Sequence, residues 1–227
     1  MKLRVRMAKT GMARFFSHLD LQRTLERVIR RAGVPIAFTQ GFSPHMKISY
    51  ASALATGTSS EGEFVDIELA EEIAPEAFLA AVNAHSPAGL RMLEARVLPQ
   101  AKSDSLTSLL TAAEYRLTLV DGDLDNLPAA VAAFLAAPVV EVTKEGKTGP
   151  RQVDIRPQVY ALAVIGPADL QALVQTGPQG NLKPDDLLSG LKAVVPAMGE
   201  PRLAQAHRLM LYRRDPESGA LTEPWEL

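Results

Sequence analysis

The sequence predicts an α+β protein made of two ferredoxin-like (βαββαβ-type) halves in tandem, each an antiparallel sheet with helices on one face. Three observations support this fold class. Segments of period two alternate with segments of helical period, the order strand, helix, strand, strand, helix, strand occurs twice, and a polar stretch at residues 99–111 separates the two sets. We therefore expect domains at residues 1–100 and 110–214, followed by a frayed tail at residues 215–227.

A strand and an amphipathic helix open the first half. Residues 2–8 alternate apolar side chains with Lys2, Arg4 and Arg6, which predicts a half-buried strand with one charged face. Apolar residues then recur at helical spacing over residues 18–32, and arginines occupy the opposite side of that helix. The strand and the helix are expected to present one basic surface.

The remaining elements follow from the same two periods. Further strands are expected at residues 34–39, 46–54, 61–69, 90–98, 113–120, 160–165, 170–177 and 204–213. Helices are expected at residues 75–84, 124–136 and 184–195, and a hairpin at residues 139–155 with its turn at Lys147, Thr148 and Gly149. In the strand at residues 61–69, Phe64, Asp66 and Glu68 are predicted to lie opposite Val65, Ile67 and Leu69.

Composition excludes several classes of protein. The 227 residues include no cysteine, which excludes disulfides, thiolate nucleophiles and metal clusters held by thiolates. No run of eighteen apolar residues occurs, and the N-terminal residues alternate charged and apolar side chains where a signal peptide would have an apolar core. We expect a cytoplasmic protein without a membrane segment.

The net charge of −2 conceals a strong asymmetry along the chain. Residues 1–50 hold ten cationic residues against Asp20 and Glu26, a net charge of +8, so the other 177 residues sum to −10. A segregated charge of this kind attracts phosphate groups or an acidic protein surface. The alternative is that the cations only solvate a helix and a strand. A second basic cluster is expected from Arg202, His207, Arg208, Arg213 and Arg214.

A long ordered string of motifs resembles a known bacterial family. The segment "FSHLDLQRTLERVIRRAGVPIAFTQGFSPHMKISYASALATGTSSEGEFVDIEL", residues 16–69, and the later "GNLKPDDLL" are similar to radical SAM-linked proteins, which occur fused to or beside radical SAM enzymes. The resemblance implies a radical SAM enzyme on a separate chain as partner, because such enzymes hold their cluster with cysteines that this sequence lacks. In architecture alone, two ferredoxin-like halves with a basic helix also resemble CRISPR RNA-processing endoribonucleases.

Three residues at the start of the basic helix suggest a catalytic triad at first sight. Ser17, His18 and Asp20 are too close in sequence to converge as a triad, and Ser17 with Asp20 instead matches a capping box. His18 is expected to stay neutral, because the positive end of the helix opposes its protonation. It is predicted either to bind a ligand or to pack as a structural residue. Metal binding by the histidines is disfavoured because no ligand spacing supports it, and no cofactor is expected.

The stretch "TQGFSPHMK", residues 39–47, is the other candidate contact. It combines an aromatic ring at Phe42, a hydroxyl at Ser43 and charged groups at His45 and Lys47. Loops of this kind offer backbone N–H groups to phosphate while the ring stacks on a base. The alternative is a turn whose glycine and proline only set its geometry.

The leading hypothesis is a non-catalytic accessory protein that binds structured RNA, or an RNA-associated substrate, through residues 1–50 and presents it to the radical SAM enzyme. The residues expected to bind RNA or a partner are Arg4, Arg6, His18, Arg23, Arg27, Arg30, Arg31, Phe42, Ser43, His45 and Lys47. One alternative is a metal-independent endoribonuclease with His18 as general base. Another is an adaptor that docks on an acidic face of its protein partner without RNA.

Overall fold

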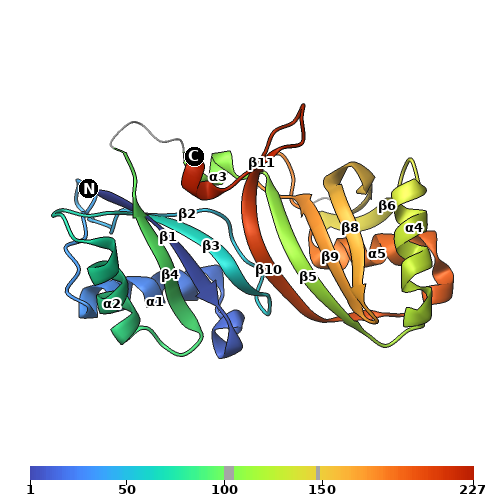
Figure 1. The fold of residues 1–227 in the computed structure, drawn as a ribbon, viewed down its shortest axis with the longest axis horizontal. Coiled ribbons are helices and arrows are strands. Elements are labelled where there is room, and N and C mark those ends of the chain that lie inside the picture. Colours follow the sequence, from blue (N-terminus) through green and yellow to red (C-terminus); the bar gives the residue numbers. More distant parts are fainter. Residues whose placement is uncertain (100–104, 147–148) are drawn as a thin grey trace. The chain divides into compact units, whose positions relative to one another are not determined.

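The chain divides into two units. The computed structural model describes residues 1–99, 105–146 and 149–227; unit 1 comprises Met1–Thr111 and Met210–Leu227, and unit 2 comprises Ala112–Leu209. The predicted α+β class is confirmed, with mostly antiparallel strands and a few helices (Figure 1). Part of the predicted linker, at residues 100–104, and positions 147 and 148 of the predicted hairpin turn lie outside the described residues.

Unit 1 contains a sheet with β1 between two antiparallel partners. Its strands are β1 (Lys2–Lys9), β2 (Ile48–Tyr50), β3 (Ser59–Glu68), β4 (Leu90–Val97) and β11 (Leu221–Thr222). Its helices are η1 (Gly11–Phe15), α1 (His18–Arg31), α2 (Pro75–His85), α3 (Leu106–Leu109) and η5 (Pro224–Glu226). β1 pairs with β3 on one side and β4 on the other, and β2 pairs with β3. Helix α1 connects β1 to β2, which pairs with β3 and not with β1. The finer prediction of two ferredoxin-like halves is not confirmed.

Two of the predicted strands in unit 1 are reduced to short pairings. Residues 34–39 contribute only the isolated bridges Ile36↔Leu69 and Phe38↔Met46, and the strand expected at residues 46–54 is limited to β2. Pro35 lacks a backbone N–H, so this segment cannot form a continuous ladder.

Helix α1 begins and ends where its sequence predicts. The Ser17 hydroxyl accepts a hydrogen bond from the Asp20 N–H at 3.2 Å, and the Asp20 carboxylate accepts one from the Ser17 N–H at 3.1 Å, so the capping box is confirmed. The helix ends before Gly33, whose φ of +65° favours glycine. Its apolar side, with Leu21, Leu25 and Ile29, is buried with α2 against one face of the sheet.

The other face of the sheet carries a buried arginine. Arg4 is 0 % exposed: its Nε donates to Asp66 Oδ1 at 2.8 Å, its Nη2 donates to Asp66 Oδ2 at 3.0 Å, and its Nη1 donates to the Pro224 carbonyl. The expectation of an exposed basic face at Arg4 is therefore wrong. The alternation of β1 correctly separates Arg4 from Leu3 and Val5, but both sets of side chains are buried.

The end of the chain covers this face and corrects one further expectation. The Trp225 ring meets the Phe64 ring edge-on at 5.0 Å, and the Arg96 guanidinium stacks on the same indole at 4.6 Å. The tail is therefore packed and not frayed. Phe64 and Asp66 of β3 are as buried as Val65 and Ile67, because the tail covers their side of β3.

Unit 2 also consists of antiparallel strands and helices. Its strands are β5 (Ala112–Val120), β6 (Glu141–Gly146), β7 (Gly149–Asp154), β8 (Val159–Gly166) and β9 (Asp169–Gln175), and its helices are η2 (Leu124–Asn126), α4 (Leu127–Ala136), η3 (Arg156–Gln158), α5 (Pro184–Val194) and η4 (Pro196–Met198). β9 pairs with β5 and β8, while β6 and β7 form a separate hairpin, as predicted. β10 (Arg202–Arg214) lies beside β5 and contributes residues to both units.

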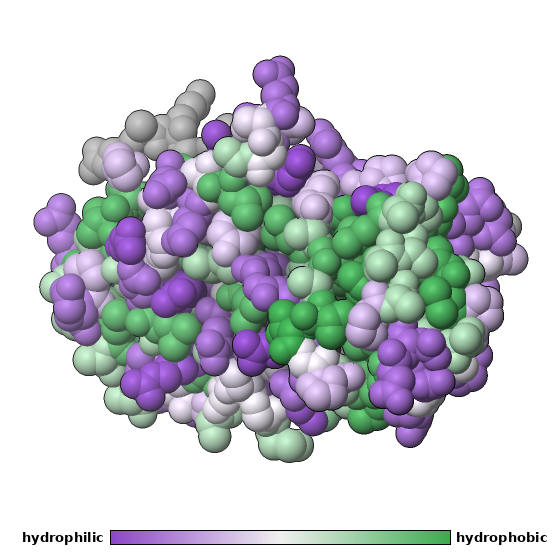
Figure 2. All heavy atoms as spheres, turned by 45° about the vertical axis from the view of Figure 1, so that its right-hand side comes forward, coloured by the Kyte–Doolittle hydropathy of each residue, from purple (hydrophilic) through white to green (hydrophobic). Residues whose placement is uncertain are grey.

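The helices of unit 2 cover one side of its sheet. Leu182 and Leu187 pack near Tyr115 and Leu117 of β5, and these side chains are buried. Hydrophobic side chains are also exposed on unit 2, including Leu135, Val139 and Ile165, and Figure 2 shows hydrophobic surface between polar residues. Among the described helices, none is both long and apolar enough to cross a membrane.

The second predicted basic cluster is not a continuous surface. Arg208 is 1 % exposed and contacts the Tyr115 hydroxyl at 3.4 Å, whereas exposed Arg202 forms an ion pair with Asp121. The position of Arg208 on a buried stretch of β10 explains the error, because the sequence pattern of this strand does not reveal what covers it.

We predict that Arg4→Met lowers the free energy of unfolding by about 3 kcal/mol, because it leaves the Asp66 carboxylate buried without its guanidinium. Urea unfolding can be followed by fluorescence of Trp225, the single tryptophan of the chain, which lies on the face that Arg4 supports. The double variant Arg4→Met/Asp66→Leu should recover a large part of the loss. Exposed Arg91 on β4 provides the control: Arg91→Met should change stability by less than about 0.5 kcal/mol. A similarly small effect of Arg4→Met would contradict the structural role of the pair.

Candidate functional site

Three arginines form a line along the exposed side of α1. Arg23, Arg27 and Arg30, which we call the arginine stripe, are spaced i, i+4 and i+7, so they lie opposite buried Leu21, Leu25 and Ile29. At 1.5 Å per residue the stripe is about 10 Å long. Exposed Arg31 lies beside it.

The arginine stripe is not neutralised locally. None of its guanidinium groups forms an ion pair with an acidic side chain in the part of the chain that the structure describes. Two acids, Asp20 and Glu26, lie three positions from Arg23. Asp20 is engaged in the capping box, and Glu26 forms no ion pair among the described residues. A cation in the last turn of a helix, such as Arg30, interacts favourably with the helix dipole and so has a structural role. Arg23 and Arg27 lie too far from that end for this role. Their charge therefore remains available to an anionic partner.

The segment at residues 39–47 forms a closed loop beyond the C-terminal end of α1. The Thr39 N–H donates to the His45 carbonyl at 2.9 Å, and the His45 N–H donates to Thr39 Oγ1 at 3.0 Å. These bonds hold the base of the loop, while Phe42 and Ser43 near its tip are exposed, Phe42 completely. Gly41 has a φ of +124°, which favours glycine at this turn. An aromatic ring is therefore presented to solvent on a hydrogen-bonded support.

The other predicted cations of unit 1 are used within the fold. Lys47 forms an ion pair with Glu68 at 2.8 Å, and Arg6 forms one with Glu94 at 3.6 Å. Arg4 is buried, as described above. Among the cations predicted to bind from residues 1–50, Arg31 and the arginines of the stripe are thus exposed without an acidic partner in the described residues.

His18 is held by its neighbours. Its ring meets the Tyr50 ring edge-on at 5.3 Å, and its Nε2 lies 3.0 Å from Gln22 Nε2. The amide nitrogen of Gln22 can only donate, so His18 Nε2 accepts this bond and its lone pair is occupied. No contact joins His18 to His45 among the described residues. This geometry does not favour His18 as a general base.

Tyr50 completes this small cluster. Its hydroxyl is buried without a hydrogen-bond partner among the described residues. Burial raises the pKa of the Tyr50 phenol, and the negative charge of Glu26 raises it further, so the hydroxyl stays protonated at physiological pH. In the described residues, no three histidine, aspartate or glutamate side chains gather to hold a metal ion.

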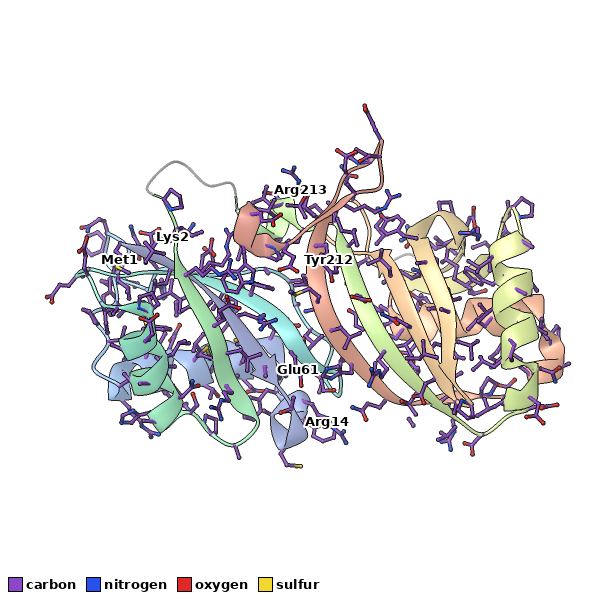
Figure 3. The ribbon with its side chains drawn as sticks, in the orientation of Figure 1. Met1, Lys2, Arg14, Glu61, Tyr212 and Arg213 are labelled. Carbon is purple, nitrogen blue, oxygen red and sulfur yellow. The ribbon has the colours of Figure 1, made fainter. Side chains whose placement is uncertain are left out.

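Three exposed apolar residues at and just before the start of α1 were missed by the sequence analysis. Met12, Phe15 and Leu19 are exposed, and Leu19 continues the line of the stripe one turn toward the start of α1. The Arg14 guanidinium lies over the Phe15 ring at 4.7 Å. Figure 3 shows Arg14 at the same end of the unit 1 sheet as Glu61 of β3. The sequence signal that could have revealed these residues was Leu19, an apolar residue on the charged side of the predicted helix.

Comparison with known proteins identifies a family. Residues 2–184 match the family model DUF2344, described as an uncharacterized protein conserved in bacteria. No curated protein matches the sequence. A solved structure described as a Cbf5–Nop10–Gar1 complex aligns with a TM-score of 0.49 at 11 % identity. The alignment covers 92 % of this chain and 48 % of that chain, so this chain spans about half of its length. Similarity at this level indicates no function.

We predict a measurable pKa effect of the capping box. Hydrogen bonds from the Ser17 hydroxyl and the Ser17 N–H hold the pKa of Asp20 below its usual value of 3.8, and the charge of Arg23 lowers it further. A lowered folded-state pKa means that the contribution of Asp20 to stability is present above pH 3.8 and is lost as the pH falls through the folded-state pKa. In an NMR titration, Ser17→Ala should move the Asp20 pKa upward toward 3.8. An unchanged pKa in that variant would contradict the assigned cause.

Proposed function

Because the chain belongs to the bacterial family DUF2344, whose members are uncharacterized, we propose its function from its own surface: a non-catalytic protein that binds RNA through the arginine stripe and the loop at residues 39–47. The observation that carries this proposal is the line of exposed arginines without acidic partners among the described residues. Arginine is suited to phosphate because its planar guanidinium offers paired N–H donors.

The spacing of the stripe supports contact with a phosphate backbone. Its length of about 10 Å corresponds to only a few nucleotides of one strand, since a strand of B-form DNA rises about 3.4 Å per nucleotide. Each arginine can then neutralise one phosphate and release a counterion, which gives binding that weakens with salt. A rigid helix holds the backbone positions of the three arginines at fixed intervals. Their line therefore matches the regular spacing of phosphates along a strand better than randomly placed cations would.

The exposed ring of Phe42 favours RNA over duplex DNA. Unpaired bases in RNA loops and bulges can stack on an aromatic side chain, whereas bases inside a duplex are already stacked. The hydrogen bonds between Thr39 and His45 support the loop, so presenting the ring requires little further ordering. Phe42 is the one phenylalanine of the loop at residues 39–47, so this loop suits contact with a single base and not a long single-stranded platform.

The role of an accessory chain is part of this proposal. The sequence contains no cysteine to hold an iron–sulfur cluster, and its resemblance to radical SAM-linked proteins supports a radical SAM enzyme as the separate partner that acts on the bound RNA or RNA-associated substrate. The engagement of His18 Nε2 by Gln22 supports binding without cleavage. Exposed Met12, Phe15 and Leu19 favour a second candidate function, docking of the same side of α1 on an acidic protein surface without RNA.

We predict that the arginine stripe sets the salt dependence of RNA binding. The triple variant Arg23→Gln/Arg27→Gln/Arg30→Gln should weaken binding to total cellular RNA and reduce the slope of log K against log salt by about 0.7 per arginine. Filter binding over a salt series measures both quantities.

The control is a second triple variant with the same change in net charge. Arg91→Gln/Arg151→Gln/Arg213→Gln removes three exposed arginines from β4, β7 and β10 and should keep the slope of the original protein. Equal losses in both variants, or no binding by the original protein, would refute the proposal. Binding to the radical SAM partner that survives nuclease treatment and depends on the stripe would establish protein docking instead. Cleavage of RNA that His18→Ala abolishes would establish the endoribonuclease.

A separate prediction concerns Phe42. Phe42→Ala should weaken RNA binding by about 1–3 kcal/mol through loss of stacking, with no change in the salt slope because no charge is removed. Phe42→Tyr keeps an aromatic face and should bind like the original protein. Both variants should unfold at the original denaturant concentration, since the ring is fully exposed. Loss of binding by Phe42→Tyr as well would contradict stacking as the cause.

A further inference from the structure

A polar hollow lies on the sheet of unit 2. Its residues are far in sequence from the arginine stripe, and they include a carboxylate as well as a cation. It has a volume of about 360 Å³ and is lined by Arg116 and Thr118 of β5, Asp169 of β9, and Gln205 and His207 of β10. Along β5 these positions alternate with buried Tyr115 and Leu117, so the hollow is on the face opposite the helices. All five lining side chains carry polar or charged groups.

Arg116 supplies a cation to this hollow. It is exposed and forms no ion pair with any acidic side chain in the described ranges, although Asp169 lines the same hollow from the neighbouring strand. A guanidinium and a carboxylate that share a hollow without pairing can each bind a different group of one ligand. The cation suits a phosphate, and the carboxylate suits a hydrogen-bond donor.

The Asp169 carboxylate is held in a fixed orientation by its neighbours. Thr118 Oγ1 donates to Asp169 Oδ1 at 2.6 Å, which orients the carboxylate. Residue 166 is a glycine, and a Cβ at that position would approach Asp169 Oδ2 to 2.9 Å. The glycine therefore leaves room for the carboxylate, and Oδ2 can accept a hydrogen bond from a ligand hydroxyl.

We propose that this hollow binds a ribose phosphate, with Arg116 on the phosphate and Asp169 on a ribose hydroxyl. Its volume is at the small end of the range of ligand pockets, about 300–1,000 Å³. The lining offers polar contacts throughout and no apolar wall for a base, so recognition is directed to the sugar and the phosphate. The ligand is either a free ribose phosphate or the 5′-phosphorylated end of an RNA. This inference is independent of the RNA surface proposed for unit 1.

Calorimetric titration with ribose 5-phosphate at millimolar concentration tests the assignment. The original protein should bind it, and Arg116→Gln should weaken binding about tenfold or more. Asp169→Asn should reduce the preference for ribose 5-phosphate over 2-deoxyribose 5-phosphate. Arg151→Gln, which removes another exposed arginine of unit 2, should bind like the original protein. Circular dichroism confirms that each variant is folded.

Further binding measurements identify the source of the ligand and separate this inference from the proposed RNA function. Binding of a 5′-phosphorylated oligoribonucleotide, but not its 5′-hydroxyl form, with loss in Arg116→Gln, would support the hollow and identify an RNA end as the source. The triple variant of the arginine stripe should bind ribose 5-phosphate normally. The inference is overturned if neither phosphorylated ligand binds, if Arg116→Gln binds equally well, or if inorganic phosphate competes as strongly as ribose 5-phosphate.

Discussion

The buried ion pair between Arg4 and Asp66 is the constraint on which unit 1 depends. A guanidinium removed from water must have its donors satisfied, and here the partners are a carboxylate on β3 and the carbonyl of Pro224. β1 is therefore joined to the last residues of the chain. The pair also specifies register, because a shift of one residue in β1 would place an apolar side chain opposite Asp66. Trp225, which meets the Phe64 ring edge-on and lies under the Arg96 guanidinium, extends the same closure.

Contacts within unit 1 use part of the positive charge of the first fifty residues. Five of its ten cations bond to groups within unit 1, to Asp66, Glu94, Glu68 or the Phe16 carbonyl; these cations are Lys2, Arg4, Arg6, Lys9 and Lys47. Arginines on the exposed side of α1 have no such partner among the described residues. The charge excess is thus concentrated on one helix surface, where it can act on a partner.

The two proposed binding surfaces differ in the physical basis of their selectivity. The arginine stripe carries cations alone, so it would respond to the density of phosphates in a polyanion and weaken steeply with salt. The hollow in unit 2 combines Arg116 with Asp169, so a polyanion without a correctly placed donor would meet a repulsive carboxylate. A small ligand with an anion at one end and hydroxyls at the other would satisfy both groups.

The sequence by itself determined the features that depend on neighbouring residues. These are the elements read from period two and period 3.6, the capping box of Ser17 and Asp20, and the exposure of the arginine stripe opposite Leu25. The tertiary structure alone decided the strand order around β1, the burial of Arg4 and Phe64, the packing of the tail and the assembly of the hollow. The physical reason is distance along the chain: Arg4 meets partners 62 and 220 positions away, and local periodicity contains no information about such contacts.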